Sequence, residues 1–258
     1  MKIYGIQFSP VWENKPKNFQ RIKDLLETTY IIPNSLLVLP ETFSTGFSLN
    51  TDITSMNEPS TSLGFCRDLA LKYKSWIMGG VILKEGDNFY NRLILVSPIG
   101  DLCGHYDKIH LIPNLGENQV HTPGIGCSLF EVQDFRICPA ICYDLRFPEL
   151  FRKGIQMGAN LFVVIACWPK VRIKHWKILL QARAVENQSY IIGINRIGSE
   201  PNNEYSGCSM IICPKGEILS ECKEGEFILE AEIKISEIKS WRTEFPVLEH
   251  MKEKTFLP

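Results

Sequence analysis

Short apolar runs alternate with amphipathic segments along most of the chain. Residues 2–9 alternate between two sets of side chains, as a strand does, and residues 35–40 form the continuous apolar run of a strand buried on both faces. Residues 15–30 instead repeat their apolar side chains at helical spacing. The same patterns predict strands at 76–83, 89–97, 102–107, 135–141, 160–166, 190–194, 207–213 and 226–233, and helices at 59–74, from about Pro148 and at 175–188. This alternation predicts one α/β domain over residues 1–258.

Turn residues mark two features of this pattern. Pro214-Lys-Gly216 predicts a hairpin between the strands at 207–213 and 226–233. Between residues 108 and 126 the periodicity fails, and this segment contains two prolines and three glycines. A loop of this length inside a compact domain is usually functional or disordered.

Three polar residues come directly after apolar strands: Glu41, Lys108 and Cys142. Strand ends of an α/β sheet converge on one crevice, and Cys142 stands at a strand-to-helix junction resembling a nucleophile elbow. There a carboxylate could take the thiol proton, while the ammonium lowers the pKa of the thiol and stabilises an oxyanion beside the Tyr143 N–H. An exposed Glu, a solvated Lys and a core Cys are the ordinary alternatives. The pattern alone leaves both interpretations open.

Composition restricts the class of protein. The net charge of −1 gives no electrostatic basis for binding nucleic acid or an anionic membrane. No apolar run approaches a membrane span, and the N-terminus resembles a strand rather than a signal peptide, so we expect a cytoplasmic protein with reduced thiols. The nine cysteines lack the paired spacing of a zinc site, and we expect no metal. A redox disulfide between Cys138 and Cys142 is an alternative, but strand spacing puts their Cα atoms roughly 13 Å apart.

Three segments resemble, in this order, the catalytic blocks of the nitrilase (carbon–nitrogen hydrolase) superfamily. They are Leu39-Pro-Glu-Thr-Phe43, Tyr106-Asp-Lys-Ile-His-Leu111 and Ile141-Cys-Tyr-Asp-Leu-Arg-Phe-Pro-Glu-Leu150. The resemblance continues through Trp168-Pro169, residues 180–190 and Asn195-Arg-Ile-Gly198 to Phe245-Pro-Val-Leu248, so it covers nearly the whole chain. Three ordered blocks are far more specific than any single motif.

The resemblance implies a four-layer α-β-β-α sandwich and a Cys–Glu–Lys triad. Glu41 would be the general base, Cys142 the nucleophile and Lys108 the oxyanion stabiliser. The family often carries a second glutamate in the loop after the lysine, and Glu117 matches that position, although a solvated loop residue is the alternative there. The implied reaction is amide hydrolysis through a thioester on Cys142, with no cofactor.

Within the superfamily, the run after Cys142 looks most like the omega-amidase branch, which acts on 2-oxoglutaramate and 2-oxosuccinamate. A carboxylate at the far end of such a substrate needs a basic partner. Arg146 or Arg172 could supply it, but Arg146 could instead form a structural ion pair with Asp144 or Glu149. An apolar wall is expected from aromatic side chains, for which plain core packing is the alternative: Phe43, Phe47, Tyr143 and Trp168.

The same resemblance suggests a homodimer through the helix at 175–188 and the C-terminal tail. Two departures weaken this expectation: Cys208 replaces a larger polar residue, and residues 249–252 lack a frequent arginine pair. Alternative functions are another amidase of the superfamily, acting on an N-carbamoyl amine, deaminated glutathione or an aliphatic amide, and a non-catalytic scaffold. Retention of Glu41, Lys108 and Cys142 together argues against the scaffold.

Overall fold

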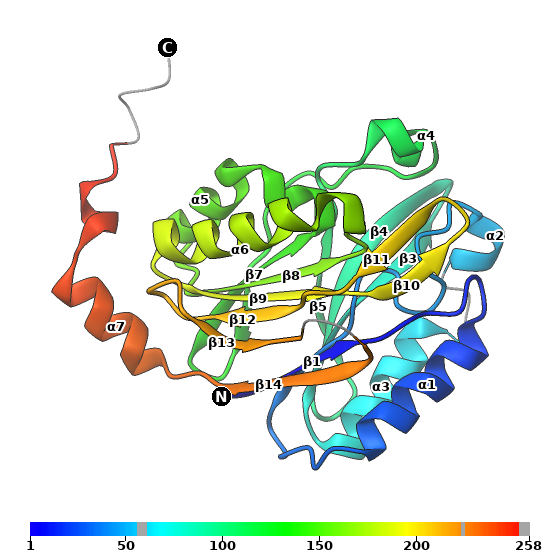
Figure 1. The fold of residues 1–258 in the computed structure, drawn as a ribbon, viewed down its shortest axis with the longest axis horizontal. Coiled ribbons are helices and arrows are strands. Elements are labelled where there is room, and N and C mark those ends of the chain that lie inside the picture. Colours follow the sequence, from blue (N-terminus) through cyan, green and yellow to red (C-terminus); the bar gives the residue numbers. More distant parts are fainter. Residues whose placement is uncertain (56–60, 223–224, 253–258) are drawn as a thin grey trace.

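Two six-stranded sheets packed face to face form the centre of the computed structural model, which describes residues 1–55, 61–222 and 225–252 (Figure 1). The first sheet has the order β14 (Phe227–Glu232), β1 (Lys2–Gln7), β2 (Leu36–Val38), β3 (Trp76–Glu85), β4 (Asn88–Val96) and β5 (Leu102–Asp107). The second has the order β13 (Ile218–Glu221), β12 (Met210–Ile212), β9 (Tyr190–Asn195), β8 (Leu161–Ala166), β7 (Phe135–Ile141) and β6 (Phe130–Val132). A separate two-stranded ribbon pairs β10 (Ile197–Glu200) with β11 (Asn203–Ser206).

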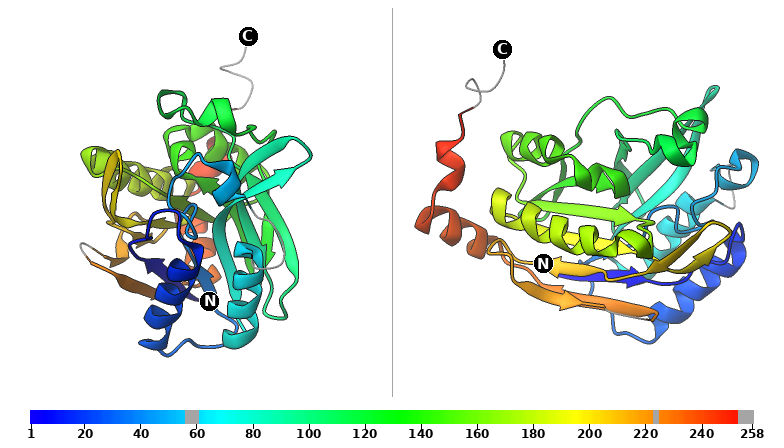
Figure 2. Two further views of the ribbon diagram at one scale, coloured as in Figure 1. Left: turned by 90° about the vertical axis from the view of Figure 1, so that its right-hand side faces the viewer. Right: turned by 45° about the horizontal axis from the view of Figure 1, so that its top comes forward.

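Helices cover the outer face of each sheet (Figures 1 and 2). Against the first sheet lie α1 (Lys15–Glu27) and α3 (Ser62–Tyr73), and against the second lie α5 (Pro148–Gln156) and α6 (Ile173–Asn187). The predicted four-layer α-β-β-α sandwich is therefore confirmed. Of the predicted helix at 59–74, residues 59 and 60 fall outside the described ranges.

Side-chain alternation along each strand explains the layers. In β1, Tyr4 and Ile6 pack with the helix layer of the first sheet, whereas Ile3 packs in the core between the sheets. All six residues of β8 are buried, because helices cover one of its faces and the first sheet covers the other. The strongest apolar runs of the sequence thus become the central strands.

The direction of the strands brings several strand ends to one edge. In the first sheet β1, β2 and β3 are parallel, and β5 returns to the direction of β3 after two antiparallel pairings. In the second sheet β7, β8 and β9 are parallel. The segments that follow β2, β5 and β7 are the ones that carry the predicted catalytic residues.

The predicted hairpin at Pro214-Lys-Gly216 has a different second strand. This turn joins β12 to β13, and β14 instead crosses to the first sheet, where it pairs antiparallel with β1. The prediction of a 207–213/226–233 hairpin was wrong because β13 has only four residues, none of them fully buried, and therefore left no apolar run to recognise. β14 thereby joins the C-terminal part of the chain to its first strand.

The remaining elements are short or peripheral. They are α2 (Thr51–Thr54), α4 (Glu117–Val120), α7 (Ile235–Glu244) and the 3₁₀ turns η1 (Pro113–Leu115), η2 (Cys142–Arg146), η3 (Lys170–Arg172) and η4 (Val247–His250). α7 and the segment after it extend away from the sheets (Figures 1 and 2). Within the described ranges no helix combines the length and the apolar character needed to cross a bilayer.

Candidate active site

Cys142 occupies a strained position at the end of β7. Its φ of 47° lies in the left-handed region, which is costly for a residue with a Cβ, and the chain turns there into η2. The side chain is 3% exposed. A strained backbone at the junction of a strand and a turn aims the thiol away from the sheet, as a nucleophile elbow does.

Asp144 fixes this turn. Its buried carboxylate accepts hydrogen bonds from the Ile141 N–H (2.9 Å), the Tyr106 hydroxyl (2.8 Å) and the His110 N–H (3.0 Å). The His110 ring nitrogen Nδ1 lies 2.8 Å from the same carboxylate. One side chain therefore connects the residue before Cys142 to the segment around Lys108 and offsets part of the strain.

Lys108 lies at the centre of a fully buried charge cluster. Its Nζ is 2.9 Å from Oε1 of Glu41 and 3.0 Å from both carboxylate oxygens of Glu117. Asn91, from β4, donates its amide hydrogens to Glu41 (2.7 Å) and to Glu117 (3.0 Å). The backbone N–H of Ile112 holds the second oxygen of Glu117 at 2.8 Å. These partners supply the compensation that buried charges require.

The cluster keeps Lys108 and Glu117 ionised. Burial alone would lower the pKa of Lys108, but the negative charges of Glu117 and Glu41 outweigh it and raise that pKa well above the ordinary value. Burial would raise the pKa of Glu117, but the Lys108 ammonium, the neighbouring His121 ring and hydrogen bonds from Asn91 and Ile112 lower it to about 2. Lys108 is therefore a permanent positive charge beside the thiol.

The Cys142 thiol is protonated in the resting site. Burial and the negative charge of Glu41 raise its pKa well above the ordinary value, although the Lys108 ammonium acts in the opposite direction. The Glu41 carboxylate lies beside the thiol. Oε2 of Glu41 accepts the Cys167 N–H at 2.7 Å. Glu41 is thus positioned to take the thiol proton when the sulfur attacks.

Gly80 makes room for the backbone of Glu41. A Cβ at this position of β3 would lie 2.7 Å from the Glu41 Cα and 2.8 Å from the Thr42 backbone nitrogen. The Gly80 N–H donates to the Pro40 carbonyl at 3.1 Å, and its own carbonyl accepts from Phe43 at 3.3 Å. The absence of a side chain therefore allows the segment after β2 to lie directly on β3.

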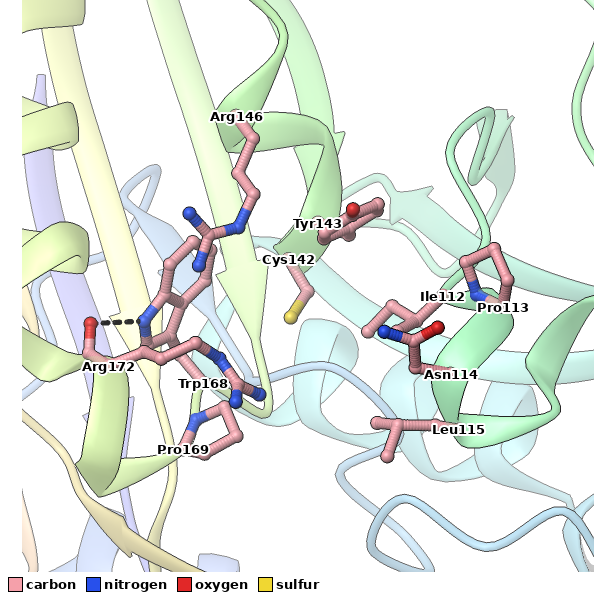
Figure 3. A pocket seen from close by; sticks show the side chains of 10 residues that line it. All are labelled: Ile112, Pro113, Asn114, Leu115, Cys142, Tyr143, Arg146, Trp168, Pro169 and Arg172. Carbon is pink, nitrogen blue, oxygen red and sulfur yellow. Dashed lines mark hydrogen bonds between the residues drawn. The ribbon is translucent and has the colours of Figure 1, made fainter.

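The thiol faces a cavity of about 470 Å³ (Figure 3). Residues of three chain segments line it: Ile112, Pro113, Asn114, Leu115, Cys142, Tyr143, Arg146, Trp168, Pro169 and Arg172. Cys142 lines this cavity, whereas Glu41, Lys108 and Glu117 do not. A small molecule in the cavity can therefore reach the sulfur.

Two arginines make the cavity basic. The Arg146 guanidinium lies 4.6 Å from the Trp168 ring centre and 5.9 Å from that of Tyr143. Burial lowers the pKa of Arg146, and the positive charge of Arg172 lowers it further. Neither arginine forms an ion pair with any residue in the described part of the chain. Both cations are therefore available to an anion in the cavity.

Residues 5–243 match the carbon–nitrogen hydrolase family. The chain belongs to this family. An omega-amidase of Yersinia enterocolitica is 36% identical over 248 residues, covering 95% of this chain and 94% of the relative. A 2-oxoglutaramate amidase of Bacillus subtilis is 35% identical over 220 residues, covering 84% and 85%. A CN-hydrolase superfamily structure from Xanthomonas campestris, with an arsenic adduct in its active site, superimposes with a TM-score of 0.92 at 30% identity, covering 100% and 98%.

In this carbon–nitrogen hydrolase, the structure brings Glu41, Lys108, Glu117 and Cys142 into one cluster. Glu117 is fully buried, so the alternative of a solvated loop residue is wrong. Tyr143, Arg146 and Trp168 line the cavity as expected, together with Arg172.

Two expectations for side chains near the site need correction. Phe43 is fully buried in the core beneath α1 and α3, where its ring centre is 6.3 Å from that of Phe19 and 6.0 Å from that of Phe65. It does not line the cavity, because the turn after Glu41 directs it toward the helix layer. The ion-pair alternative for Arg146 was also wrong, since Asp144 is occupied by the contacts of the η2 turn and Arg146 instead approaches His175 Nδ1 at 3.4 Å.

The sequence alone did not identify several residues that shape the hydrolase site. Asn91 and Asp144 hold the cluster and the turn, and the Cys167 N–H holds Glu41. Asn91 left only a weak signal, because β4 also contains the polar residues Asn88 and Arg92. The backbone contribution of Cys167 has no signal in the sequence, since any residue type except proline supplies an N–H.

Proposed function

We propose that this hydrolase is an omega-amidase that converts a short 2-oxo dicarboxylic acid monoamide, such as 2-oxoglutaramate or 2-oxosuccinamate, to the dicarboxylate and ammonia. The observation that carries the proposal is the presence of two arginines, Arg146 and Arg172, in the cavity that Cys142 faces; neither forms an ion pair within the described part of the chain. Two relatives at 35–36% identity bear the names omega-amidase and 2-oxoglutaramate amidase, which supports the same substrate class.

The acylation step uses the cluster behind the sulfur. Cys142 attacks the amide carbonyl carbon while Glu41, which lies beside the thiol, takes its proton. The developing oxyanion is stabilised by the Lys108 ammonium and the Tyr143 N–H. Glu41 then gives the proton to the leaving nitrogen, the C–N bond breaks, and ammonia departs from a thioester on Cys142.

Deacylation repeats the chemistry with water as the nucleophile. Glu41 takes a proton from water, the hydroxide attacks the thioester carbonyl, and the same cation and N–H stabilise the oxyanion. Collapse of the intermediate releases the carboxylic acid, and the proton on Glu41 returns to the Cys142 sulfur. Glu117 takes no proton in this scheme, since its pKa of about 2 keeps it ionised, and it serves to hold Lys108.

The two arginines distinguish this substrate class from neutral amides. Mutual repulsion of Arg146 and Arg172 contributes to the lowered pKa of Arg146. A substrate carboxylate between them relieves this repulsion and forms charge-assisted hydrogen bonds. The amide at the other end of the substrate is then directed toward Cys142.

The test is a panel of amides in which ammonia release is measured. It contains 2-oxoglutaramate, 2-oxosuccinamate, an aliphatic amide of equal length without the carboxylate, an N-carbamoyl amine and deaminated glutathione. We expect the highest kcat/KM for the 2-oxo acid monoamides and no activity of Cys142→Ala on any of them. A higher kcat/KM for the neutral amide, the N-carbamoyl amine or deaminated glutathione would contradict the substrate while leaving the amidase chemistry intact. Wild-type activity of Cys142→Ala would contradict both.

A further inference from the structure

Two cysteine sulfurs, those of Cys127 and Cys138, lie outside the catalytic cluster and against α5. The Cys127 sulfur is 3.8 Å from the Leu150 carbonyl oxygen. A Cβ built on Gly154 would lie 2.8 Å from the sulfur of Cys138, so that sulfur lies against the next turn of the same helix. The two thiols are close enough for each to shift the pKa of the other.

The strand register supports this proximity. β6 and β7 are antiparallel with Phe130 opposite Ile137, and extending this register by one residue places position 129 opposite Cys138. Cys127 is two residues farther along, which is the diagonal neighbour on the same face of the sheet. Residues 127–129 precede the paired part of β6. A disulfide requires Cys127 to move slightly closer to Cys138, and this segment can make that movement without breaking the β6–β7 pairing.

The two thiols differ in access and acidity. Cys127 is partly exposed and follows the exposed residues Ile125 and Gly126, whereas Cys138 is fully buried in β7. The neighbouring Cys138 thiol and the positive charge of Lys153 lower the pKa of the Cys127 thiol to about 7, although partial burial opposes this. The Cys127 thiol and burial raise the pKa of Cys138. A solvent-accessible thiolate therefore lies beside a protonated thiol.

We propose that Cys127 and Cys138 form a peroxide-reactive pair, in which Cys127 is oxidised first and Cys138 closes an intramolecular disulfide. The Cys127 thiolate attacks one oxygen of a hydroperoxide, the O–O bond breaks, and hydroxide or alkoxide leaves a sulfenic acid on Cys127. The Cys138 sulfur then attacks the Cys127 sulfur, the S–S bond forms, the S–O bond breaks, and the hydroxyl departs with the Cys138 proton as water. The two thiols thus supply the two electrons that reduce the peroxide.

This pair is distinct from the catalytic thiol and from the Cys138–Cys142 disulfide considered above. Cys138 packs against α5, whereas Cys142 turns toward the cavity. Cys142 is only 3% exposed, and its raised pKa leaves it protonated. The catalytic sulfur is therefore expected to react with peroxide more slowly than Cys127. The bond would join the end of the segment that carries Lys108 and Glu117 to the strand that leads into Cys142.

The experiment is peptide mapping of the full-length protein after treatment with about one equivalent of hydrogen peroxide near neutral pH. Remaining thiols are blocked before digestion. We expect a crosslinked peptide joining Cys127 to Cys138, an intact mass lower by two hydrogen atoms, and loss of the crosslink on reduction with dithiothreitol. Cys127→Ser abolishes the crosslink. In Cys138→Ser, dimedone traps the sulfenic acid on Cys127, because no second thiol resolves it.

Cys103→Ser is the matched control, because Cys103 is an exposed cysteine. We expect this variant to keep both the Cys127–Cys138 crosslink and the basal amidase activity. In the wild type, the rate of Cys127 alkylation by iodoacetamide should rise with pH around a midpoint near 7. In Cys138→Ser, the rate at pH 7 should be several-fold lower. The wild-type map decides the matter even where a variant fails to fold. Oxidation of Cys103 or Cys142 before Cys127, or oxidation of Cys127 without the crosslink to Cys138, would overturn the proposal.

Discussion

Lys108 shows how one buried cation can serve both structure and chemistry. Two carboxylates, Glu41 and Glu117, share its ammonium, and the Asn91 amide bonds to both. Isolated charges at this depth would be strongly destabilising, but here each has several partners. The carboxylates are not equivalent, because both oxygens of Glu117 accept from Lys108, whereas Glu41 bonds to Lys108 through one oxygen and lies beside the Cys142 thiol. These contacts explain why we assign Glu117 to holding Lys108 and Glu41 to taking the thiol proton.

The pH dependence of stability isolates the contribution of Glu117. Its pKa of about 2 in the folded protein lies below the ordinary 4.5, so its ionised form stabilises the fold above about pH 4.5, and this stabilisation is lost as the pH falls toward 2. At pH 7 we expect Glu117→Gln to unfold at a lower urea concentration than the wild type. As the pH falls from about 4.5 toward 2, the variant should lose less stability than the wild type. Glu131→Gln, at an exposed ion pair, is the control and should follow the wild type. An unchanged acid profile in Glu117→Gln would contradict the assignment.

The arginines of the cavity can be tested separately from the nucleophile. Arg172→Gln removes one partner of the substrate carboxylate, and the loss of a charge-assisted hydrogen bond costs about 1.5–3 kcal/mol, or roughly 10- to 100-fold in kcat/KM. We expect this loss for 2-oxoglutaramate, chiefly through KM, and no comparable loss for a neutral amide. Lys174→Gln removes an exposed positive charge two residues away and should leave kcat/KM unchanged for both 2-oxoglutaramate and the neutral amide. Equal losses on the charged and neutral substrates would show that Arg172 does not meet the carboxylate.

Among the elements, the η2 turn decides where the sulfur points. It is a single 3₁₀ turn that begins at a residue with positive φ, and such geometry persists only where neighbouring contacts hold it. Asp144 supplies those contacts from inside the turn. The Asp144 carboxylate therefore connects the turn to the end of β7 and to the segment around Lys108.

Asp144→Asn tests this dependence. An amide cannot accept at both of its positions, so a donor among Ile141, Tyr106 and His110 loses its partner, which costs about 1–3 kcal/mol of stability. We also expect kcat to fall on every amide substrate, because the turn no longer fixes Cys142. Thermal unfolding and steady-state kinetics measure the two effects. Asp134→Asn, at an exposed site in the β6–β7 turn, is the control, and a variant at residue 144 with wild-type kcat would contradict the positioning role.

Elements bounded by turn residues could be predicted from the sequence, and short elements of mixed polarity could not. The predicted strands at 102–107 and 135–141 coincide with β5 and β7, because turn residues bound each run. Glu41, Lys108 and Cys142 were found because each follows such a strand. β10, β11 and β13 have four residues each, with mixed polarity, and pair through tertiary contacts. Asn91 and the Cys167 N–H belong to the site only through the packing of the two sheets.

At the scale of the molecule, the site depends on the packing of the two sheets against each other. Glu41, Lys108 and Glu117 follow strands of the first sheet, and Cys142 follows a strand of the second. The nucleophile and its base therefore come from different sheets, and the hydrogen bond from the Cys167 N–H to Glu41 also crosses between them. Any movement of one sheet against the other changes the distance between nucleophile and base. This requirement accounts for a buried core that is continuous between the sheets.

Assembly is the remaining question at this scale, and we propose a homodimer formed through α6 and the C-terminal segment. η3 and α6 expose three large apolar side chains, Val171 (84%), Ile178 (54%) and Val185 (55%), and the segment after α7 exposes Phe245 (55%). Apolar side chains gathered on one helix are typical of an interface. We expect light scattering to give twice the chain mass of 29.5 kDa.

Ile178→Asp should lower the mass toward that of one chain, because it places a charge in the proposed interface. Ile125→Asp is the control, since Ile125 is fully exposed at the end of the 108–126 segment, and its mass should equal that of the wild type. Because Arg172 and Ile173 connect this surface to the cavity, dissociation should also raise KM for the amide substrate. A wild-type mass of one chain at every protein concentration would contradict the dimer. If the Ile178→Asp variant is still a dimer, the interface lies elsewhere on the molecule.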